Sequence, residues 1–152
     1  MSRILITIAA CGSAALLLAA LGFQHLGGLA PCKLCFWQRY PHAAAIVIGV
    51  IAVFVPVSAL MWLGWLAVVA AGGVGVFHVG VEQGWWEGPT TCTSAPVTNL
   101  SPEQLMEQIM SAPLVRCDEI AWELFGISMA GWNVILSFTL ALLWFAAARH
   151  NR

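Results

Sequence analysis

The chain has 152 residues, of which 61% are apolar and 9% are charged. An average soluble domain is roughly 45–50% apolar and about 25% charged, so this composition excludes a water-soluble globular protein. The formal net charge is -1, which excludes the strongly basic surface that holds nucleic acid. A chain of this length has room for one membrane domain, and not for a membrane anchor plus a separate soluble enzyme.

Four stretches of the chain are long and apolar enough to cross a membrane, because a span needs about 20 mostly apolar residues. In chain order they are residues 4–22, 42–60, 61–81 and 128–148. The only turn signal between the second and third stretches lies between Pro56 and Ala59, so their connection must be short. The sequence therefore predicts an all-α integral membrane protein, an antiparallel four-helix bundle with both termini on one side.

Two loops, residues 23–41 and 82–127, connect the spans on the side opposite the termini. Within the longer loop, Ser101, Pro102 and Gln104 form a capping box with proline at the first helical position. This pattern predicts a short amphipathic helix. We expect that helix to lie flat on the membrane surface or to pack on the end of the bundle.

The first apolar stretch could also be a signal peptide, because Arg3 precedes it and Leu29-Ala30-Pro31-Cys32 faintly resembles a lipoprotein cleavage site. Its 19 residues exceed the apolar core of a signal peptide, usually about 7–15 residues. Proline directly before the cysteine also argues against cleavage. We therefore expect this stretch to be retained as a span.

The positive charges do not decide the orientation, because three lysines or arginines flank the spans on each side. Four of the five cysteines lie in the two loops, and stable disulfides persist in oxidising compartments such as the periplasm. We expect a bacterial inner-membrane protein with periplasmic loops and cytoplasmic termini.

Cys32 and Cys35 form a Cys-x-x-Cys motif at the outer end of the second span. Its spacing suits an easily reduced disulfide or half of a metal site. A zinc site would need Cys92 and Cys117 as its other ligands, but these are separated by 24 residues and suit a disulfide that closes a flexible loop. The spacing favours redox chemistry and no metal, with two structural disulfides or a zinc module as the alternatives.

Two ionisable residues stand near this motif. Arg39 follows Cys35 by four residues, so on a helix beginning near Phe36 it would lie on the same face and favour the thiolate; the alternative is a membrane-anchoring arginine. His78 lies inside the third span, where an ionisable residue is a functional candidate; the alternative is a histidine bonded to a backbone carbonyl. Cys11, in the middle of the first span, is expected to be a small packing residue.

Two segments resemble a known family. Residues 31–41, PCKLCFWQRYP, resemble the first periplasmic loop of the disulfide-bond formation protein B (DsbB) family, bacterial inner-membrane thiol oxidases that use quinone. Cys117-Asp118-Glu119, Trp122, residues 125–129 and Trp132-Asn133 resemble the approach to that family's last span. The vitamin K epoxide reductase family also uses Cys-x-x-Cys, but typically late in the bundle, so the order here favours the DsbB family.

The resemblance implies a route for electrons. Cys92 and Cys117 would form the disulfide that meets a reduced, periplasmic, thioredoxin-like (DsbA-like) thiol oxidase, with Cys92 taking up the mixed disulfide. Cys32 and Cys35 would reoxidise that pair, and Cys35 would pass the electrons to a bound ubiquinone or menaquinone. The implied activity is that of a quinone-reducing protein-disulfide oxidoreductase.

The resemblance also implies a quinone site. Arg39 would stabilise negative charge on the thiolate and the quinone, and His78 and Met129 would lie near the quinone. A vitamin K epoxide reductase-like quinone reductase is the alternative enzyme. A small transporter is disfavoured, because ion relays usually need more embedded ionisable residues.

Overall fold

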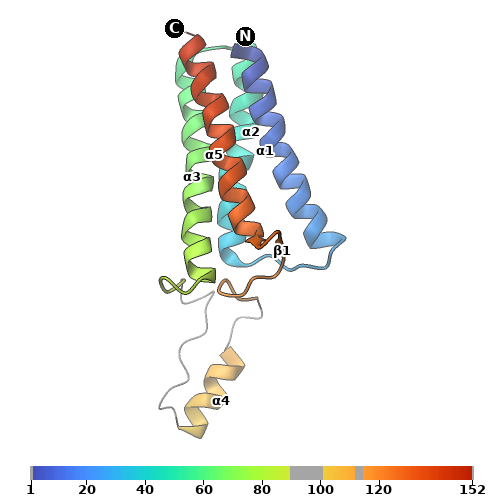
Figure 1. The fold of residues 1–152 in the computed structure, drawn as a ribbon, viewed down its shortest axis with the longest axis vertical. Coiled ribbons are helices and arrows are strands. Elements are labelled where there is room, and N and C mark those ends of the chain that lie inside the picture. The colour runs from blue at the N-terminus through green and yellow to red at the C-terminus, as the bar shows by residue number, and fades with distance from the viewer. Residues whose placement is uncertain (1, 90–100, 112–114, 152) are drawn as a thin grey trace.

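The computed structural model describes residues 2–89, 101–111 and 115–151. Four long helices lie side by side as a bundle, and both chain termini lie at one end of it (Figure 1). These helices are α1 (Ser2–His25), α2 (Lys33–Phe54), α3 (Ser58–Glu82) and α5 (Met129–His150). Between α3 and α5 the chain forms a short helix, α4 (Pro102–Ser111), and two strands, β1 (Glu123–Leu124) and β2 (Ile127–Ser128). The predicted all-α fold is confirmed.

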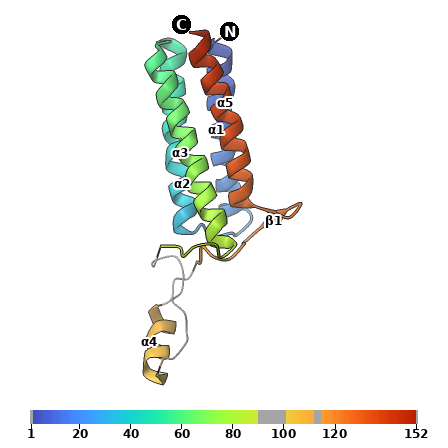
Figure 2. The same ribbon diagram turned by 60° about the vertical axis from the view of Figure 1, so that its left-hand side comes forward.

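Three of the described helices, α1, α3 and α5, are long and apolar enough to cross a membrane, with mean hydropathies of 2.4, 1.9 and 1.6. Helix α2 is 22 residues long, but its first turns carry the polar side chains of Gln38, Arg39 and His42, which lower its hydropathy. It nevertheless packs against α1 and α3 along the bundle (Figure 2). The helices follow the order α1, α2, α3, α5 around the bundle axis.

Helix α2 begins at Lys33, nine residues before the start at His42 that we predicted. Cys32 caps the helix, because its Sγ accepts a hydrogen bond from the backbone N–H of Cys35 at 3.2 Å. Pro41 lies inside the helix and removes one intrahelical hydrogen bond, yet the helix continues to Phe54. Residues 33–41, predicted as loop, therefore form about two and a half turns of helix.

The connection between α2 and α3 is short, as predicted, although the helix ends differ from the predicted boundaries. Helix α2 ends at Phe54 and α3 begins at Ser58, whereas the predicted spans met between residues 60 and 61. Pro56 interrupts the helical hydrogen bonding here. The side chain of Asn151, at the end of α5, donates to the backbone oxygen of Pro56 at 2.8 Å, which ties the last helix to this turn.

Cys11 is exposed on the outer face of α1, so its predicted role as a packing residue is wrong. The two residues that follow it face inward: a Cβ on Gly12 would lie 2.5 Å from Leu140 of α5, and Ser13 is fully buried. Successive helix residues point about 100° apart. The inward positions of Gly12 and Ser13 therefore direct Cys11 away from the bundle.

The end of the bundle that carries the termini is packed around Trp144 of α5, whose side chain is fully buried. We call this region the packed end. A Cβ added to Gly64 of α3 would lie 2.6 Å from the Trp144 ring, so glycine makes room for the indole. The other buried members of this core are Ile6, Ala9, Ala45, Ala52, Met61, Val68, Leu140, Ala141, Ala147 and Ala148.

The predicted helix in the long loop is confirmed as α4. The backbone N–H of Gln104 donates to Ser101 Oγ at 3.3 Å, and the backbone N–H of Ser101 donates to Gln104 Oε1 at 2.9 Å, which is the reciprocal capping box. In both views α4 stands clear of the bundle (Figures 1 and 2). Both positions that we considered for α4, on the end of the bundle and on a membrane surface, stay predictions.

A two-strand hairpin precedes α5, and the sequence analysis did not predict it. Glu123 pairs with Ser128 in an antiparallel ladder, and the two turn residues, Phe125 and Gly126, have φ values of 55° and 73°. Two consecutive positive φ values are typical of a type I′ hairpin turn. Ser128 then caps α5 by accepting the backbone N–H of Gly131 at 3.1 Å, so the hairpin fixes where the last helix begins.

Candidate active site

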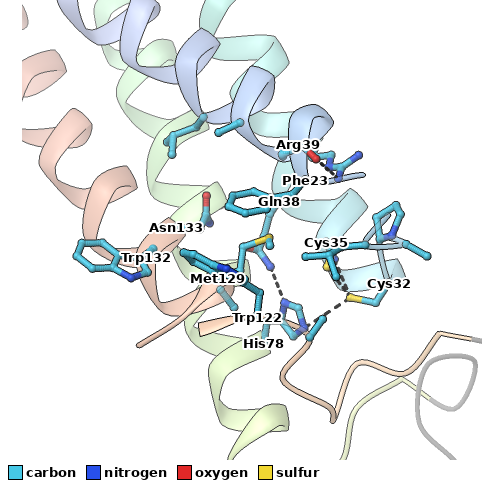
Figure 3. Close-up of a pocket in the computed structure, with 18 of the residues that line it drawn as sticks. Phe23, Cys32, Cys35, Gln38, Arg39, His78, Trp122, Met129, Trp132 and Asn133 are labelled. Atoms are coloured by element: carbon cyan, nitrogen blue, oxygen red, sulfur yellow. Dashed lines mark hydrogen bonds between the residues drawn. The ribbon is translucent and has the colours of Figure 1, made fainter. Parts of the chain in front are cut away.

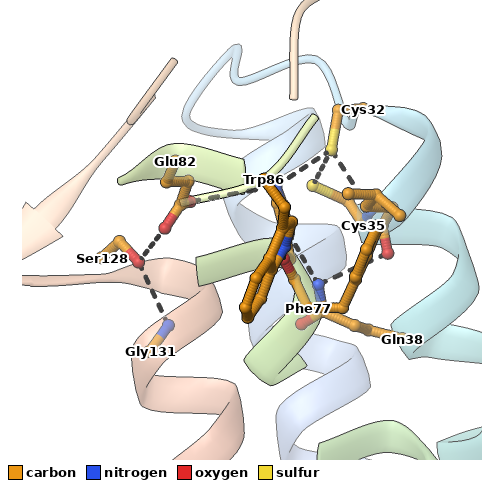
Figure 4. Close-up of polar contacts among 10 residues, drawn as sticks. Cys32, Cys35, Gln38, Phe77, Glu82, Trp86, Ser128 and Gly131 are labelled. Carbon is orange, nitrogen blue, oxygen red and sulfur yellow. Dashed lines mark hydrogen bonds and ion pairs between the residues drawn. The ribbon is translucent and has the colours of Figure 1, made fainter. Parts of the chain in front are cut away.

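The two cysteines of the Cys-x-x-Cys motif lie at the first turn of α2, with their Sγ atoms 2.8 Å apart (Figure 4). Cys32 is buried, Cys35 is partly exposed, and both are free thiols. The hydrogen bond between the sulfurs and, next, burial raise the pKa of the Cys32 thiol above its ordinary value. Cys35 is the third residue of the helix, where the helix dipole favours negative charge. Cys32 therefore keeps its proton while Cys35 carries the first negative charge.

His78 of α3 faces the two cysteines (Figure 3). Its Nε2 lies 3.6 Å from the Sγ of Cys32, and its Nδ1 lies 2.7 Å from the side-chain nitrogen of Gln38. An amide N–H that donates to Nδ1 leaves the ring proton on Nε2. The ring is buried, and it also bonds to the backbone of Cys117. The backbone bond that we considered as the alternative is therefore present together with the cysteine contact.

Glu82 lies one helical turn after His78, and its Oε1 is 3.9 Å from the Nε2 of that ring. The hydroxyl of Ser128 donates to its other carboxylate oxygen (Figure 4). We predicted Glu82 as the first residue of the outer loop, but it is the last residue of α3 and its side chain is only 5% exposed. The bond to Ser128 ties α3 to the start of α5 beside the cysteines.

A cavity of about 320 Å³ opens beside the cysteine pair (Figure 3). Its walls come from the four long helices and from loop residues 115–124, and they are mostly apolar. Five of the predicted site residues line it: Cys32, Cys35, Arg39, His78 and Met129. The size is that of a pocket for a small organic molecule. The structure therefore brings residues from three separate parts of the chain to one cavity.

Arg39 is held by α1. Its Nη1 donates to Gln24 Oε1 at 2.6 Å, and its Nη2 donates to the backbone oxygen of Ala20 at 3.2 Å. The guanidinium also lies over the ring of Phe36, 5.2 Å from its centroid. These contacts fix a positive charge at the cavity wall, and from there the charge of Arg39 acts on the Cys35 sulfur and favours its thiolate, the effect that we predicted.

A second buried histidine, His42, lies deeper in the bundle and also lines the cavity. Its Nδ1 is 3.3 Å from Ser13 Oγ, and its Nε2 is 3.0 Å from Asn133 Oδ1 and 3.2 Å from Ser137 Oγ. Asn133 in turn donates to the backbone oxygen of Ala71. One polar network therefore connects α1, α2, α3 and α5 inside the bundle.

Comparison with known proteins identifies the family. A family model described as "Disulfide bond formation protein DsbB" matches residues 2–147. The chain belongs to the DsbB family. The disulfide bond formation protein B of Dechloromonas aromatica is 31% identical over 134 residues, which cover 82% of this chain and 79% of that protein. That of Shewanella amazonensis is 30% identical over 155 residues, covering 95% of this chain and 89% of that protein. No solved structure gives a significant match.

Membership of the DsbB family confirms the resemblance drawn from the sequence. The chain is therefore a membrane protein of disulfide bond formation and a disulfide-forming oxidoreductase. The free Cys32–Cys35 pair at the wall of a cavity is consistent with that chemistry.

The second cysteine pair is described in part. Cys117 is fully buried and lies in a small cluster with Cys32, Leu34 and Val81, and its sulfur is in a disulfide. Cys92 lies outside the described residues, so its pairing with Cys117 and its reaction with a partner stay predictions. The cluster shows that Cys117 lies close to Cys32 of the Cys-x-x-Cys motif.

An ion pair flanks Cys117 in this DsbB family member. Arg116 Nη2 lies 2.6 Å from Asp118 Oδ2, and Arg116 Nε lies 3.3 Å from Glu119 Oε1. The hydrogen bond from Arg116 holds the pKa of the Asp118 carboxyl below its ordinary value. These contacts hold the backbone on both sides of the buried cysteine.

Sequence reasoning missed the roles of Gln38, His42 and Glu82. Their polar character was visible, but all three were assigned to span ends or loops. One signal could have found two of them. If Cys32 is read as a helix cap, the helix begins at Lys33 and places Gln38 and His42 one turn apart on the same face. Both residues are buried in the structure.

Proposed function

We propose that this DsbB family member reoxidises a reduced, periplasmic, thioredoxin-like (DsbA-like) dithiol oxidase and passes the electrons to a quinone. One observation carries the proposal: Cys32 and Cys35 line an apolar cavity whose wall also holds Arg39. Thiol–disulfide exchange needs an accessible sulfur, whereas a quinone is an apolar molecule of the bilayer. A thiol pair at this position is within reach of both.

Electrons enter through the Cys92–Cys117 disulfide, which is reduced to two thiols as the two thiols of the partner become a disulfide. The oxidised Cys32–Cys35 pair then reoxidises Cys92 and Cys117 and is itself reduced. The burial of Cys117 in one cluster with Cys32 supports this second exchange, because the attacking and attacked sulfurs must meet. Burial of Cys117 also favours Cys92 as the sulfur that takes up the mixed disulfide.

The cavity suits the ring of ubiquinone or menaquinone. Its volume of about 320 Å³ and its apolar lining, which includes Phe23 and Met129, match a flat apolar ring. Arg39 and His42 offer polar groups at different points of the wall for the ring oxygens. A bound quinone supplies an acceptor for two electrons and two protons.

The protein's own residues prepare the thiol pair for oxidation. Cys35 carries the negative charge at the helix start, and Arg39, held in place by Gln24 and Ala20, supplies a positive charge to the same cavity. His78 holds its Nε2 3.6 Å from the Sγ of Cys32. It is therefore the group positioned to exchange a proton with that sulfur as the pair changes redox state.

The orientation follows from the same proposal. Cys32 and Cys35 lie at the end of the bundle opposite the termini, at the start of α2 (Figure 1). A periplasmic partner requires this end to face the periplasm. The termini are then cytoplasmic, in the bacterial inner membrane.

Anaerobic mixing tests the function directly. Purified protein, supplied with ubiquinone or menaquinone, is mixed with a reduced thioredoxin-like dithiol oxidase while the quinone absorbance is followed. We expect one quinone to be reduced for each disulfide formed in the partner. The rate should fall at least about a thousandfold in Cys35→Ser, because the nucleophilic sulfur is lost.

Cys11→Ser is the matched control, because Cys11 is exposed on the outer face of α1, away from the cavity. Its rate should stay within about twofold of the unsubstituted protein. Full turnover in Cys35→Ser, or disulfide formation without loss of quinone absorbance, would contradict the proposal.

A further inference from the structure

We propose that the reduced Cys32–Cys35 pair and His78 form a binding site for a thiophilic divalent cation, with Zn²⁺ the ion best matched to the donors. Two sulfurs from the start of α2 and one imidazole from α3 converge here (Figure 3). Zinc takes this donor set in proteins, and three protein ligands leave one coordination position open. The site goes beyond disulfide formation, and occupying it requires neither quinone nor partner.

The three ligand atoms already have nearly the spacing that the metal requires. All lie within 4.8 Å of one another. Zn–S bonds of about 2.3 Å and Zn–N bonds of about 2.0–2.1 Å at tetrahedral angles place sulfur and nitrogen about 3.6 Å apart. The Sγ of Cys32 lies 3.6 Å from the Nε2 of His78. The two sulfurs, 2.8 Å apart, must separate to about 3.8 Å, which a small rotation of the partly exposed Cys35 side chain provides.

Gln38 controls whether the imidazole is available to the metal. Its amide nitrogen donates to Nδ1 of His78 at 2.7 Å, so the ring proton is on Nε2. Ligation through Nε2 requires that proton on Nδ1 and an acceptor facing it. The amide provides this acceptor by turning end for end. Ligation then gives up two hydrogen bonds, the long one from the amide to the backbone oxygen of Leu34 at 3.4 Å and the one from the ring to the backbone of Cys117. Gln38 is thus a positioning residue for the site.

Metal binding at this site depends on the redox state of the cysteines. The cation forms two metal–sulfur bonds and displaces the protons of the thiols, and no electrons are transferred. An oxidised Cys32–Cys35 disulfide has no thiolate to offer. Because the ligands line the cavity, a bound cation holds the pair reduced beside it and opposes its oxidation.

The test uses Co²⁺ as a spectroscopic probe and Zn²⁺ as its competitor, both as chloride salts. The 152-residue chain carries Cys11→Ser, Cys92→Ser and Cys117→Ser, so that Cys32 and Cys35 are its remaining cysteines. The reduced protein, titrated without oxygen, should bind one Co²⁺ with thiolate-to-cobalt absorption, and Zn²⁺ should displace it. The same protein with an oxidised pair should bind none.

Two substitutions separate this site from adventitious binding to a dithiol. His78→Ala should lower the Co²⁺ affinity at least about tenfold, whereas His25→Ala, at the exposed end of α1, should leave it unchanged. Gln38→Glu should bind Co²⁺ more tightly than Gln38→Leu does, because a carboxylate at this position accepts the Nδ1 proton and orients the ring for ligation through Nε2. His78→Gln replaces His78→Ala if the latter does not fold.

Three results would overturn the proposal: less than one equivalent of Co²⁺ bound by the reduced protein, equal affinity in His78→Ala and His25→Ala, or equal binding by the oxidised protein. Quinone reduction by metal-free protein is measured separately. Failure of the metal site therefore leaves the proposed oxidase function standing, and failure of quinone reduction leaves the metal site standing.

Discussion

At the packed end of the bundle Trp144 fills the space between the four long helices, whereas at the other end the same helices enclose a cavity of about 320 Å³. Gly49 and Gly64 lie against the Trp144 ring, within a core of alanines and larger apolar side chains. Around the cavity, the polar side chains of Gln38, Arg39 and Glu82 are held by hydrogen bonds to neighbouring elements. The difference indicates that the stability of the bundle comes mainly from the packed end. The cysteine end can therefore contain a cavity and buried polar side chains without unfolding the bundle.

The largest expected effect is on stability, at the packed end. Trp144→Ala should lower the free energy of unfolding by about 3–5 kcal/mol, because it leaves a cavity among four helices. Leu142→Ala is the control on the same helix: Leu142 is 70% exposed, and its loss should cost about 0.5 kcal/mol or less. Unfolding of the detergent-solubilised proteins measures both. Equal costs would show that the packed end does not hold the bundle together.

The next effect is on quinone binding, at the cavity end. Arg39→Met should raise the KM for quinone about tenfold, because it removes a fixed positive charge from the cavity wall. The KM of Arg39→Lys should lie between those of the unsubstituted protein and Arg39→Met, since lysine keeps the charge but cannot reach Gln24 and Ala20 together. Steady-state quinone reduction measures both variants. An unchanged KM in Arg39→Met would show that the charge of Arg39 does not contribute to quinone binding.

The smallest effect belongs to the partly exposed ion pair between Arg116 and Asp118, beside Cys117. The pKa of Asp118 is lowered from its ordinary 3.8 by Arg116, so the folded state binds the proton less readily than the unfolded chain. The stabilisation is therefore present above about pH 4 and is lost as the pH falls through the folded-state pKa. Asp118→Asn should lower the Tm at pH 7 by about 1–2 °C and abolish this pH dependence. A larger change would mean that the pair also positions the cysteine loop.

The sequence predicted the long helices and the Cys-x-x-Cys pair because these depend on local properties, namely apolar length and residue spacing. It placed the start of the second span at His42, nine residues after the start of α2, because Pro41 was taken as the end of a loop. In the structure Cys32 caps a helix that tolerates the proline. His42 is buried because α2 begins early and the His42 ring bonds to α5 inside the bundle. Glu82 is buried because it bonds to Ser128 at the start of α5. Hydrophobic periodicity along the sequence does not reveal such contacts between helices.

Cys11 illustrates a different limit. Its neighbours Ala10 and Gly12 are small, which is typical of a packing face, and the apolar stretch around it is uniform. The direction in which a residue of such a helix points depends on where the neighbouring helices lie. Gly12 faces Leu140, and that contact, which no pattern in α1 reveals, turns Cys11 outward.

One wall of the cavity belongs to segment 115–124, a loop that ends in strand β1, and not to a helix. The same segment carries Cys117 and leads into the hairpin that starts α5. An insertion or deletion there would alter the volume of the cavity and the reach of the second cysteine pair in a single step. If the proposed function holds, changes of loop length during evolution act on the choice of acceptor and the choice of partner as one inherited trait.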